Sequence, residues 1–168
     1  KFNPVVFLLS ADEINHSILE GAFIVYLGHH GDDLAQLADI VLPSPAYTEK
    51  SSTYMNMEGR VLQTTRCYHP PGVSKEEWKI FRALSNNFSQ KLKFNNLSEL
   101  RNEISNLFPA FKEINNLPIT SKLDFGSSTK IENRDLEYNI KNFYMTDVIS
   151  RASITMANCS REILNKAA

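Results

Sequence analysis

Two adjacent histidines and three aspartates lie within eleven positions of the chain, inside the stretch YLGHHGDDLAQLADIVLP over residues 26–43. Imidazole and carboxylate groups bind metal ions and carry out general acid–base catalysis, so this stretch is the first candidate for chemistry. A metal site needs three or four such groups that converge on one point. His29 and His30 are consecutive, and the side chains of consecutive residues tend to point in different directions.

Two other interpretations compete with a metal site in this stretch. A metal would need further ligands of no diagnostic spacing, for which the candidates are Asp32, Asp33, Cys67 and His69. The stretch can instead be a polar loop shaped by Gly28 and Gly31, in which an aspartate caps the next short helix. A loop that binds a ligand is the third interpretation. We expect the polar loop, with Asp32 or Asp33 as the cap.

Sulphur donors are scarce, because Cys67 and Cys159 are the two cysteines of the sequence and lie 92 positions apart. An iron–sulphur cluster generally needs four thiolates, often in close pairs. The sequence therefore predicts no cluster here, and two distant cysteines suit a reducing compartment. Cys159 falls on an apolar helical stripe and is expected to be a core thiol. Cys67 follows Arg66, and a neighbouring cation favours the reactive thiolate, so a reactive Cys67 is the minor alternative.

Other catalytic signatures are missing from the sequence, which has no G-x-S-x-G elbow, no G-x-G-x-x-G loop and no Walker A loop. Glu49 and Glu58 could act as a carboxylate pair, and Arg60 and Arg66 could hold an anion. Ion pairs within the protein are the simpler use of these charges. We predict no catalytic residue and no metal ligand in this chain.

The composition fits one globular domain, with 168 residues, 42% apolar residues and a net charge of -1. A balanced charge predicts no strong attraction to nucleic acid or to an anionic membrane. No apolar run approaches the roughly 20 residues that span a bilayer. The first residues, KFNPVVFLL, contain no methionine and read as a buried strand, so we expect the chain to be part of something longer.

The elements that must position the polar stretch are three apolar runs, over residues 5–9, 22–27 and 39–42. These runs do not alternate with polar residues, which is typical of parallel strands covered on both faces. The intervening segments are short, and helical turns are expected at 15–20 and 33–38. The first 42 residues therefore predict a β-α-β-α-β unit of a doubly wound, mostly parallel sheet.

Ligands of doubly wound sheets bind beyond the carboxyl ends of the strands. Three polar segments would meet at that edge, namely residues 10–12, 28–31 and 43–44. The histidine-containing stretch is thus expected where a ligand loop would lie.

The rest of the chain predicts a small hairpin and three helices. TYMNMEGRVLQT over residues 53–64 indicates a hairpin that turns at Glu58-Gly59. Ser74 and Glu77 form a capping-box pattern for an amphipathic helix over 75–88. A second helix follows Asn96 and ends before Pro109.

The third helix is predicted near the carboxyl terminus, capped by Thr146 or Asp147. Its apolar stripe consists of Ile149, Ala152, Met156, Cys159 and Ile163. Polar residues of no clear period precede it. The predicted organisation is therefore an α/β domain over 1–114, truncated on its amino-terminal side, an extended connector over 115–142, and a C-terminal helical segment over 143–168.

Four sequence blocks carry a resemblance to a known family: ADIVLP (38–43), AYTEKSSTYMNMEGR (46–60), GVSKEEWKIFRALS (72–85) and NFYMTDVISRAS (142–153). The chain resembles the large iron–sulphur subunit of respiratory complex I, the G-subunit family of NADH–quinone oxidoreductases. Molybdopterin oxidoreductases such as formate dehydrogenases are similar more widely. The shared positions are Ala38, Asp39, Leu42, Pro43, Glu49, Thr53, Asn56, Glu58, Gly59, Arg60, Pro71 and Trp78.

This resemblance implies the carboxyl-terminal part of a subunit that carries [2Fe–2S] and [4Fe–4S] clusters on cysteine-rich motifs elsewhere. The fold implied is a molybdopterin-oxidoreductase-like domain that no longer holds a pterin. No cluster ligand or catalytic residue carries over, and five family positions are expected to be structural: Asp39, Glu49, Asn56, Glu58 and Arg60. The loop with His29 and His30 is then expected to serve structure or to contact a neighbouring subunit.

The function implied is structural and assembly support for NADH-to-quinone electron transfer coupled to proton translocation. The implied partners are other hydrophilic-arm subunits and the cluster-bearing part of the same subunit, with no nucleic acid and no membrane span. The implied location is peripheral to the inner membrane, on the bacterial cytoplasmic or mitochondrial matrix side. One alternative is a fragment of an active molybdopterin oxidoreductase. A weaker one is a metal-binding module built on His29, His30 and His69.

Overall fold

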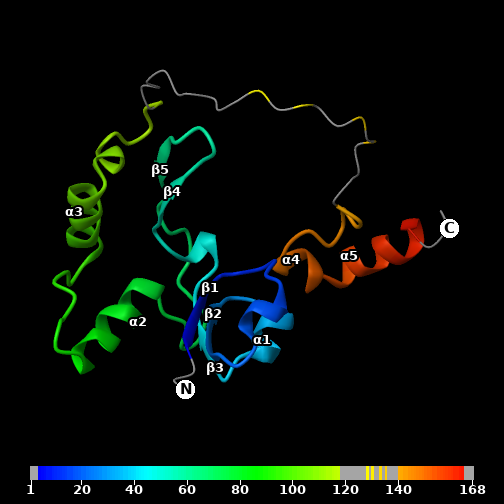
Figure 1. The fold of residues 1–168 in the computed structure, drawn as a ribbon, viewed down its shortest axis with the longest axis horizontal. Coiled ribbons are helices and arrows are strands. Elements are labelled where there is room, and N and C mark those ends of the chain that lie inside the picture. Colours follow the sequence, from blue (N-terminus) through cyan, green and yellow to red (C-terminus); the bar gives the residue numbers. More distant parts are fainter. Residues whose placement is uncertain are drawn as a thin grey trace. The chain divides into compact units, whose positions relative to one another are not determined.

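The computed structural model of the protein describes residues 4–117, 128, 130, 133, 135 and 140–164. Figure 1 shows the helices and strands in chain order. The chain divides into two compact units: residues 1–26, 30–41 and 122–168 form the first, and residues 27–29 and 42–121 form the second. Most of the predicted connector over 115–142 lies outside the described residues.

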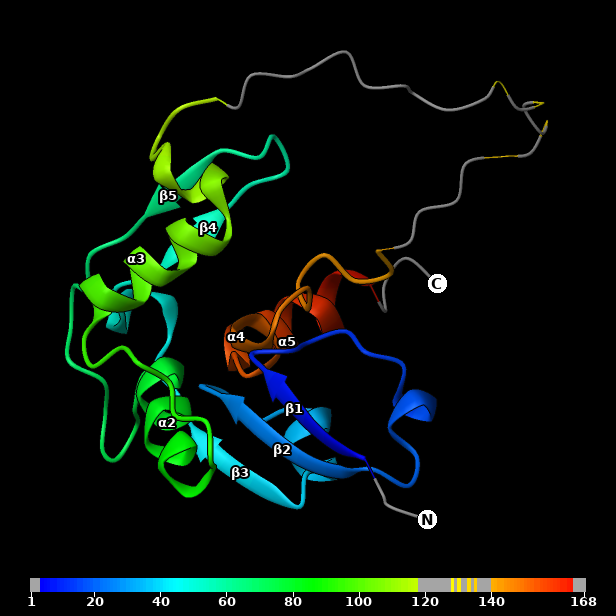
Figure 2. The ribbon, with the colours of Figure 1, turned by 60° about the vertical axis from the view of Figure 1, so that its left-hand side comes forward.

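Three strands, β1 (Val5–Leu9), β2 (Phe23–Gly28) and β3 (Ile40–Pro43), form a parallel sheet in the order β1-β2-β3 (Figure 2). The helix α1 (Asp33–Leu37) connects β2 to β3. The connection from β1 to β2 contains the 3₁₀ helix η1 (His16–Leu19), which begins where the Asn15 side chain accepts a hydrogen bond from the Ser17 amide. The predicted α/β class and its β-α-β-α-β order are confirmed.

One face of this sheet carries a core of five buried residues, Leu8, Leu19, Ile24, Tyr26 and Leu34. On β1 the alternate residues point the other way, and Val5 and Leu9 are 57% and 49% exposed. Ile40 and Val41 of β3 are also about half exposed. The prediction that all three strands are covered on both faces is therefore wrong for β1 and β3 among the described residues.

In the second unit, β4 (Thr53–Met55) and β5 (Val61–Gln63) pair as the predicted antiparallel hairpin. The Asn56 side-chain oxygen accepts hydrogen bonds from the Glu58 and Arg60 amides, at 3.0 and 2.9 Å. Gly59 takes a φ of 81°, a backbone conformation that glycine adopts without steric cost. The turn at Glu58-Gly59 is confirmed.

The helix α2 (Glu77–Leu84), extended by the 3₁₀ turn η3 (Ser85–Asn87), confirms the predicted helix over 75–88. The predicted capping box is wrong. Glu76 is the N-cap residue and makes no side-chain cap, while the Glu77 carboxylate accepts from Lys50 Nζ at 2.5 Å. The Ser74 hydroxyl is buried and has no hydrogen-bond partner among the residues that the structure describes. The Glu77 carboxylate is thus engaged in a long-range ion pair with Lys50 instead of in the predicted capping box.

The helix α3 (Leu97–Leu107) follows Asn96 as predicted, because the Asn96 side chain accepts from the Glu99 amide at 2.9 Å. The 3₁₀ helix η4 (Pro109–Lys112) comes directly after it, with Pro109 at its first turn. Another 3₁₀ helix, η2 (Tyr47–Glu49), lies between β3 and β4. Among the described residues, no helix combines the length and apolar character needed to cross a membrane.

The predicted single carboxyl-terminal helix is wrong, because two short helices occupy its stripe. They are α4 (Val148–Arg151) and α5 (Ile154–Cys159), and a π-helical turn, η5 (Ser160–Leu164), follows. Asp147 caps α4, as predicted, and the Ser153 hydroxyl caps α5 by accepting from the Met156 amide. A serine at this place offers a new helix start, so the chain breaks there instead of continuing.

The α4 cap predicts an acid-sensitive helix end. Hydrogen bonds from the Ser150 amide and hydroxyl hold the pKa of Asp147 below its ordinary value of 3.8. Because the folded pKa is lowered, the cap contributes stability above the ordinary pKa and loses it as the pH falls through the folded value. In a carboxyl ¹³C NMR titration, Asp147 is expected to titrate below 3.8. Ser150→Ala is expected to move the midpoint upward, and an unchanged midpoint would contradict this account.

Candidate functional site

Side chains from three separate segments meet at the carboxyl edge of the parallel sheet, within the first unit. Asp12 follows β1, Asp32 follows β2, and Arg151 ends α4. Arg151 Nε donates to Asp32 Oδ2 at 2.6 Å, and Arg151 Nη2 donates to Asp12 Oδ1. Its Nη1 donates to the Met145 carbonyl at 3.3 Å. One guanidinium therefore bridges two strand-end loops.

The three charged side chains are partly shielded, at 26% exposure for Arg151, 29% for Asp12 and 24% for Asp32. Opposite charges at this separation attract more strongly when water is partly excluded. A cavity of about 410 Å³ adjoins them, and its other lining residues are Glu13, Ile14, Asn15, His16 and Asp33. Carboxylates outnumber cations there, so this edge suits a cation and disfavours an anion.

Asp32 occupies the predicted N-cap position of α1 but does not cap it with its side chain. Its carbonyl instead accepts from the Ala35 and Gln36 amides, at 2.9 and 3.2 Å. This fixes the backbone of Asp32 and leaves the carboxylate for Arg151. The cap predicted for Asp32 is thus right in position and wrong in chemistry.

The histidine-containing loop, residues 28–31, is anchored by Tyr26, whose side chain is buried at 2% exposure. Tyr26 Oη donates to the His30 carbonyl at 3.2 Å. Burial, with a smaller effect from the negative charge of Asp32, raises the pKa of Tyr26. The phenol is therefore protonated at neutral pH and serves as a hydrogen-bond donor. The charge of His30 also contributes to lowering the pKa of Asp147, beside α4.

No group of three or more histidine, cysteine, aspartate or glutamate side chains within the described part of the chain is placed to hold a metal ion. His69 and Cys67 belong to the second unit, whereas His30, Asp32 and Asp33 belong to the first. Cys67 is exposed, Cys159 is partly buried, and both are free thiols.

The five family positions direct their side chains to nearby backbone or to each other. Asp39 Oδ2 accepts from the Ile24 amide at 2.7 Å, and the Asp39 amide donates to the Ile24 carbonyl at 2.9 Å. Glu49 Oε2 accepts from the Ala46 amide at 3.0 Å, which closes η2. Each of these carboxylates therefore fixes a chain segment at the start or end of β3.

The remaining three family positions lie in the hairpin turn. Besides its two backbone contacts, Asn56 donates from Nδ2 to Glu58 Oε2 at 3.3 Å. Arg60 Nε lies 3.7 Å from the same carboxylate oxygen, and Arg60 Nη1 donates to the Asn115 carbonyl at 3.1 Å. The turn is thereby connected to the chain that leaves η4.

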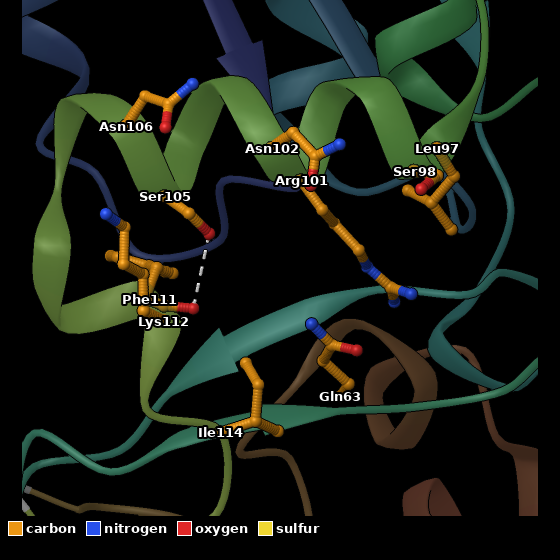
Figure 3. Close-up of a pocket in the computed structure, with 10 residues that line it drawn as sticks. All are labelled: Gln63, Leu97, Ser98, Arg101, Asn102, Ser105, Asn106, Phe111, Lys112 and Ile114. Carbon is orange, nitrogen blue, oxygen red and sulfur yellow. Dashed lines mark hydrogen bonds between the residues drawn. The ribbon is translucent and has the colours of Figure 1, made fainter.

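A second cavity, of about 750 Å³, lies between α3, η4 and β5 (Figure 3). Arg101 reaches across it and donates to Thr53 Oγ1 and to the Ser52 carbonyl, at 3.3 and 3.4 Å. Ser105 Oγ donates to the Phe111 carbonyl. The lining contains no carboxylate, imidazole or thiol, and none of the predicted site residues. Ser105, one of its two serines, already donates its hydroxyl to a backbone carbonyl.

Sequence reasoning missed Arg151. It lies beside the apolar stripe, and nothing local indicates partners 119 and 139 residues away. Parallel topology brings Asp12 and Asp32 to one edge, which the strand pattern did predict. Arg151, which completes the cluster with Asp12 and Asp32, lies outside the β-α-β-α-β unit.

Comparisons with known proteins agree with the four sequence blocks. A molybdopterin oxidoreductase family model matches residues 2–87. A second model, for the carboxyl-terminal region of the NADH-ubiquinone oxidoreductase G subunit, matches residues 114–159. The two matches follow each other along one chain, which no unrelated α/β domain would be expected to show.

The curated proteins similar to this chain are, like the second family model, named as subunits of NADH-ubiquinone or NADH-quinone oxidoreductase. The mitochondrial NADH-ubiquinone oxidoreductase 78 kDa subunits of Candida albicans and Neurospora crassa are 44% and 43% identical, over 92% of this chain. The G subunit of the NADH-quinone oxidoreductase of Rickettsia bellii is 40% identical over 92% of the chain. The chain spans only 22–23% of the length of these relatives. It therefore belongs to the molybdopterin oxidoreductase family and corresponds to the carboxyl-terminal part of the large iron–sulphur subunit of respiratory complex I, the G-subunit family of NADH–quinone oxidoreductases.

Proposed function

We propose that this part of the subunit is a non-catalytic scaffold of NADH–quinone oxidoreductase, which supports electron transfer that takes place elsewhere in the subunit. The observation that carries the proposal is the pairing of the two family matches with 40–44% identity to complex I subunits. Clusters of the [2Fe–2S] and [4Fe–4S] types belong, in this proposal, to other parts of the full-length protein.

The hydrogen bonding of the family positions supports a scaffold role. Asp39 accepts from the Ile24 amide on strand β2. Glu49 and Asn56 each accept from a backbone amide within their own turn. A side chain that must bind substrate or move protons needs a free donor or acceptor directed at the reacting atom. In this arrangement the acceptors are already engaged, and they stabilise β3, η2 and the hairpin turn.

The family name implies a molybdopterin cofactor. Such a cofactor would bind at the carboxyl edge of the sheet, so the charges of the residues at that edge decide whether it fits. A pterin cofactor of this kind carries phosphate, which needs cations or free amides at such an edge. Here Asp12 and Asp32 already pair with the guanidinium of Arg151. Glu13 and Asp33 add further carboxylates to the adjoining cavity. The residues present do not fit an anionic cofactor.

The partners and location follow from the same proposal. The scaffold would contact the cluster-bearing part of its own subunit and other hydrophilic-arm subunits. It would lie peripheral to the inner membrane, on the bacterial cytoplasmic or mitochondrial matrix side. The half-exposed residues Val5 and Leu9 of β1 and Val41 of β3 provide apolar surface for such contacts.

Assembly and turnover must be measured separately to test the scaffold role. Glu49→Ala and Asn56→Ala, made in the full-length subunit, are expected to lower the amount of assembled complex severalfold on native gels, because each removes the side-chain oxygen that accepts from a backbone amide. NADH–quinone turnover per assembled complex is expected to stay unchanged, because neither side chain touches a reacting atom. Glu103→Ala is the matched control, since Glu103 is exposed on α3.

Two results would contradict the scaffold proposal. The first is normal assembly with turnover per complex reduced tenfold or more in Glu49→Ala or Asn56→Ala. The second is a molybdenum content of one per purified full-length protein, which would favour an active molybdopterin oxidoreductase.

A further inference from the structure

We propose that Asp12 and Asp32 form a guanidinium-binding site at the carboxyl edge of the parallel sheet, and that Arg151 is its resident ligand. The site docks the carboxyl-terminal region of the chain where a doubly wound sheet would otherwise receive a small molecule. This assignment goes beyond the scaffold role and does not depend on it.

The first argument is the geometry of the donors. Arg151 uses all three of its nitrogens, since Nε donates to Asp32, Nη2 donates to Asp12 and Nη1 donates to the Met145 carbonyl. A planar guanidinium presents these donors in fixed directions, whereas an ammonium is a single point charge. Acceptors on three separate segments therefore match arginine and would be only partly satisfied by lysine.

The second argument is the way the two acceptors are held. Asp32 is fixed at the N-cap position of α1, where its carbonyl accepts from two helix amides. Asp12 lies three residues beyond the end of β1. The strands and α1 thus fix the backbone of both loops by contacts that do not involve Arg151. Two carboxylates held close together repel each other unless a cation lies between them.

The third argument is the identity of the segments that the site connects. Asp12 and Asp32 lie in the part that matches the molybdopterin oxidoreductase model, residues 2–87. Arg151 lies in the part that matches the G-subunit carboxyl-terminal model, residues 114–159. The guanidinium is therefore a direct link between the two family-matched parts of one chain, in a single compact unit.

Hydrogen–deuterium exchange of the full-length protein, measured by mass spectrometry, tests the site. Arg151→Ala and Arg151→Lys are each expected to raise exchange roughly tenfold or more in α4 and in the loops that contain Asp12 and Asp32. Arg161→Ala is the matched control, because Arg161 is exposed and donates only to Asn158 among the described residues. Protection of β2 reports that each variant has folded.

Chemical rescue separates a guanidinium site from a simple ion pair. Methylguanidinium, at a concentration far below denaturing, is expected to restore protection to the two loops of Arg151→Ala. Methylammonium at equal concentration is expected to restore much less. The α4 segment should stay unprotected, because the added ion is not attached to it. The triple variant Asp12→Asn/Asp32→Asn/Arg151→Ala should not respond.

The proposal is overturned if Arg151→Lys exchanges like the wild type, since a point charge would then suffice. Equal rescue by both ions would overturn it for the same reason. It is also overturned if Arg151→Ala and Arg161→Ala behave alike. If Arg151→Ala loses protection throughout β2, the folded Arg151→Lys variant supplies the deciding comparison.

Discussion

Replacing Leu27 by alanine is expected to lower the free energy of unfolding of the sheet by about 3 kcal/mol. Leu27 lies near the end of β2, the central strand, and its side chain is 0% exposed. The change removes buried methyl groups and leaves a cavity whose lining loses van der Waals contacts. Strands fixed by neighbours on either side relax little, so the cavity is not expected to collapse.

Hydrogen exchange of β2 amides in the full-length protein measures this loss, since local opening free energies are obtained without unfolding the rest. Leu107→Ala is the control, because Leu107 lies at the end of α3 and is 71% exposed. That variant is expected to change the stability of its own helix by well under 1 kcal/mol. A loss below about 1 kcal/mol for Leu27→Ala would show that the core around β2 rearranges to fill the space.

Local patterns predicted the elements that are decided locally. Continuous apolar runs located β1, β2 and β3, because runs without polar alternation are typical of parallel strands. Glu58-Gly59 located the hairpin turn, and the structure shows that Asn56 and Gly59 form it through contacts within five residues. Asn96 located the start of α3 through a single side-chain cap. At the hairpin turn and at the start of α3, the contacts that select the structure lie within a few residues.

Predictions failed where a distant partner competes with a local one. Glu77 was expected to cap its own helix, but Lys50 takes its carboxylate from 27 residues away. Asp32 or Asp33 was expected to cap α1, and Arg151 pairs with the side chain of Asp32 from 119 residues away. A carboxylate that caps a helix accepts from neutral amides, whereas a carboxylate paired with lysine or arginine also gains the attraction between two full charges. The long-range pair is therefore favoured where the fold brings the cation close. The sequence alone does not show which distant cation the fold brings close to a given carboxylate.

The candidate site could be predicted in part for the same reason. The edge that carries Asp12 and Asp32 follows from the strand order, since the carboxyl ends of parallel strands meet. Arg151, the residue that completes the site, belongs to the carboxyl-terminal segment. In the sequence, polar residues of no clear period separate that segment from the α/β part. In the histidine-containing stretch, the backbone carbonyl of His30 accepts a hydrogen bond from the Tyr26 hydroxyl.

Asp39→Ala is expected to destabilise the pairing of β2 with β3 by about 2 kcal/mol. The Asp39 carboxylate accepts from the Ile24 amide at 2.7 Å, while its own amide donates to the Ile24 carbonyl at 2.9 Å. Ile24 is 6% exposed, so its amide loses a charged acceptor in a place that water reaches poorly. Alanine keeps the backbone bond and removes only the side-chain acceptor.

Asp39→Asn distinguishes the hydrogen bond from the charge. An asparagine carbonyl oxygen can accept from the Ile24 amide, so this variant is expected to retain more than half of the stability that alanine loses. Hydrogen exchange of β2 and β3 amides in the full-length protein gives both values. If asparagine and alanine cost the same, the negative charge would be the important property. The family position Asp39 would then act through electrostatics at the sheet edge, and its place beside β2 would be secondary to its charge.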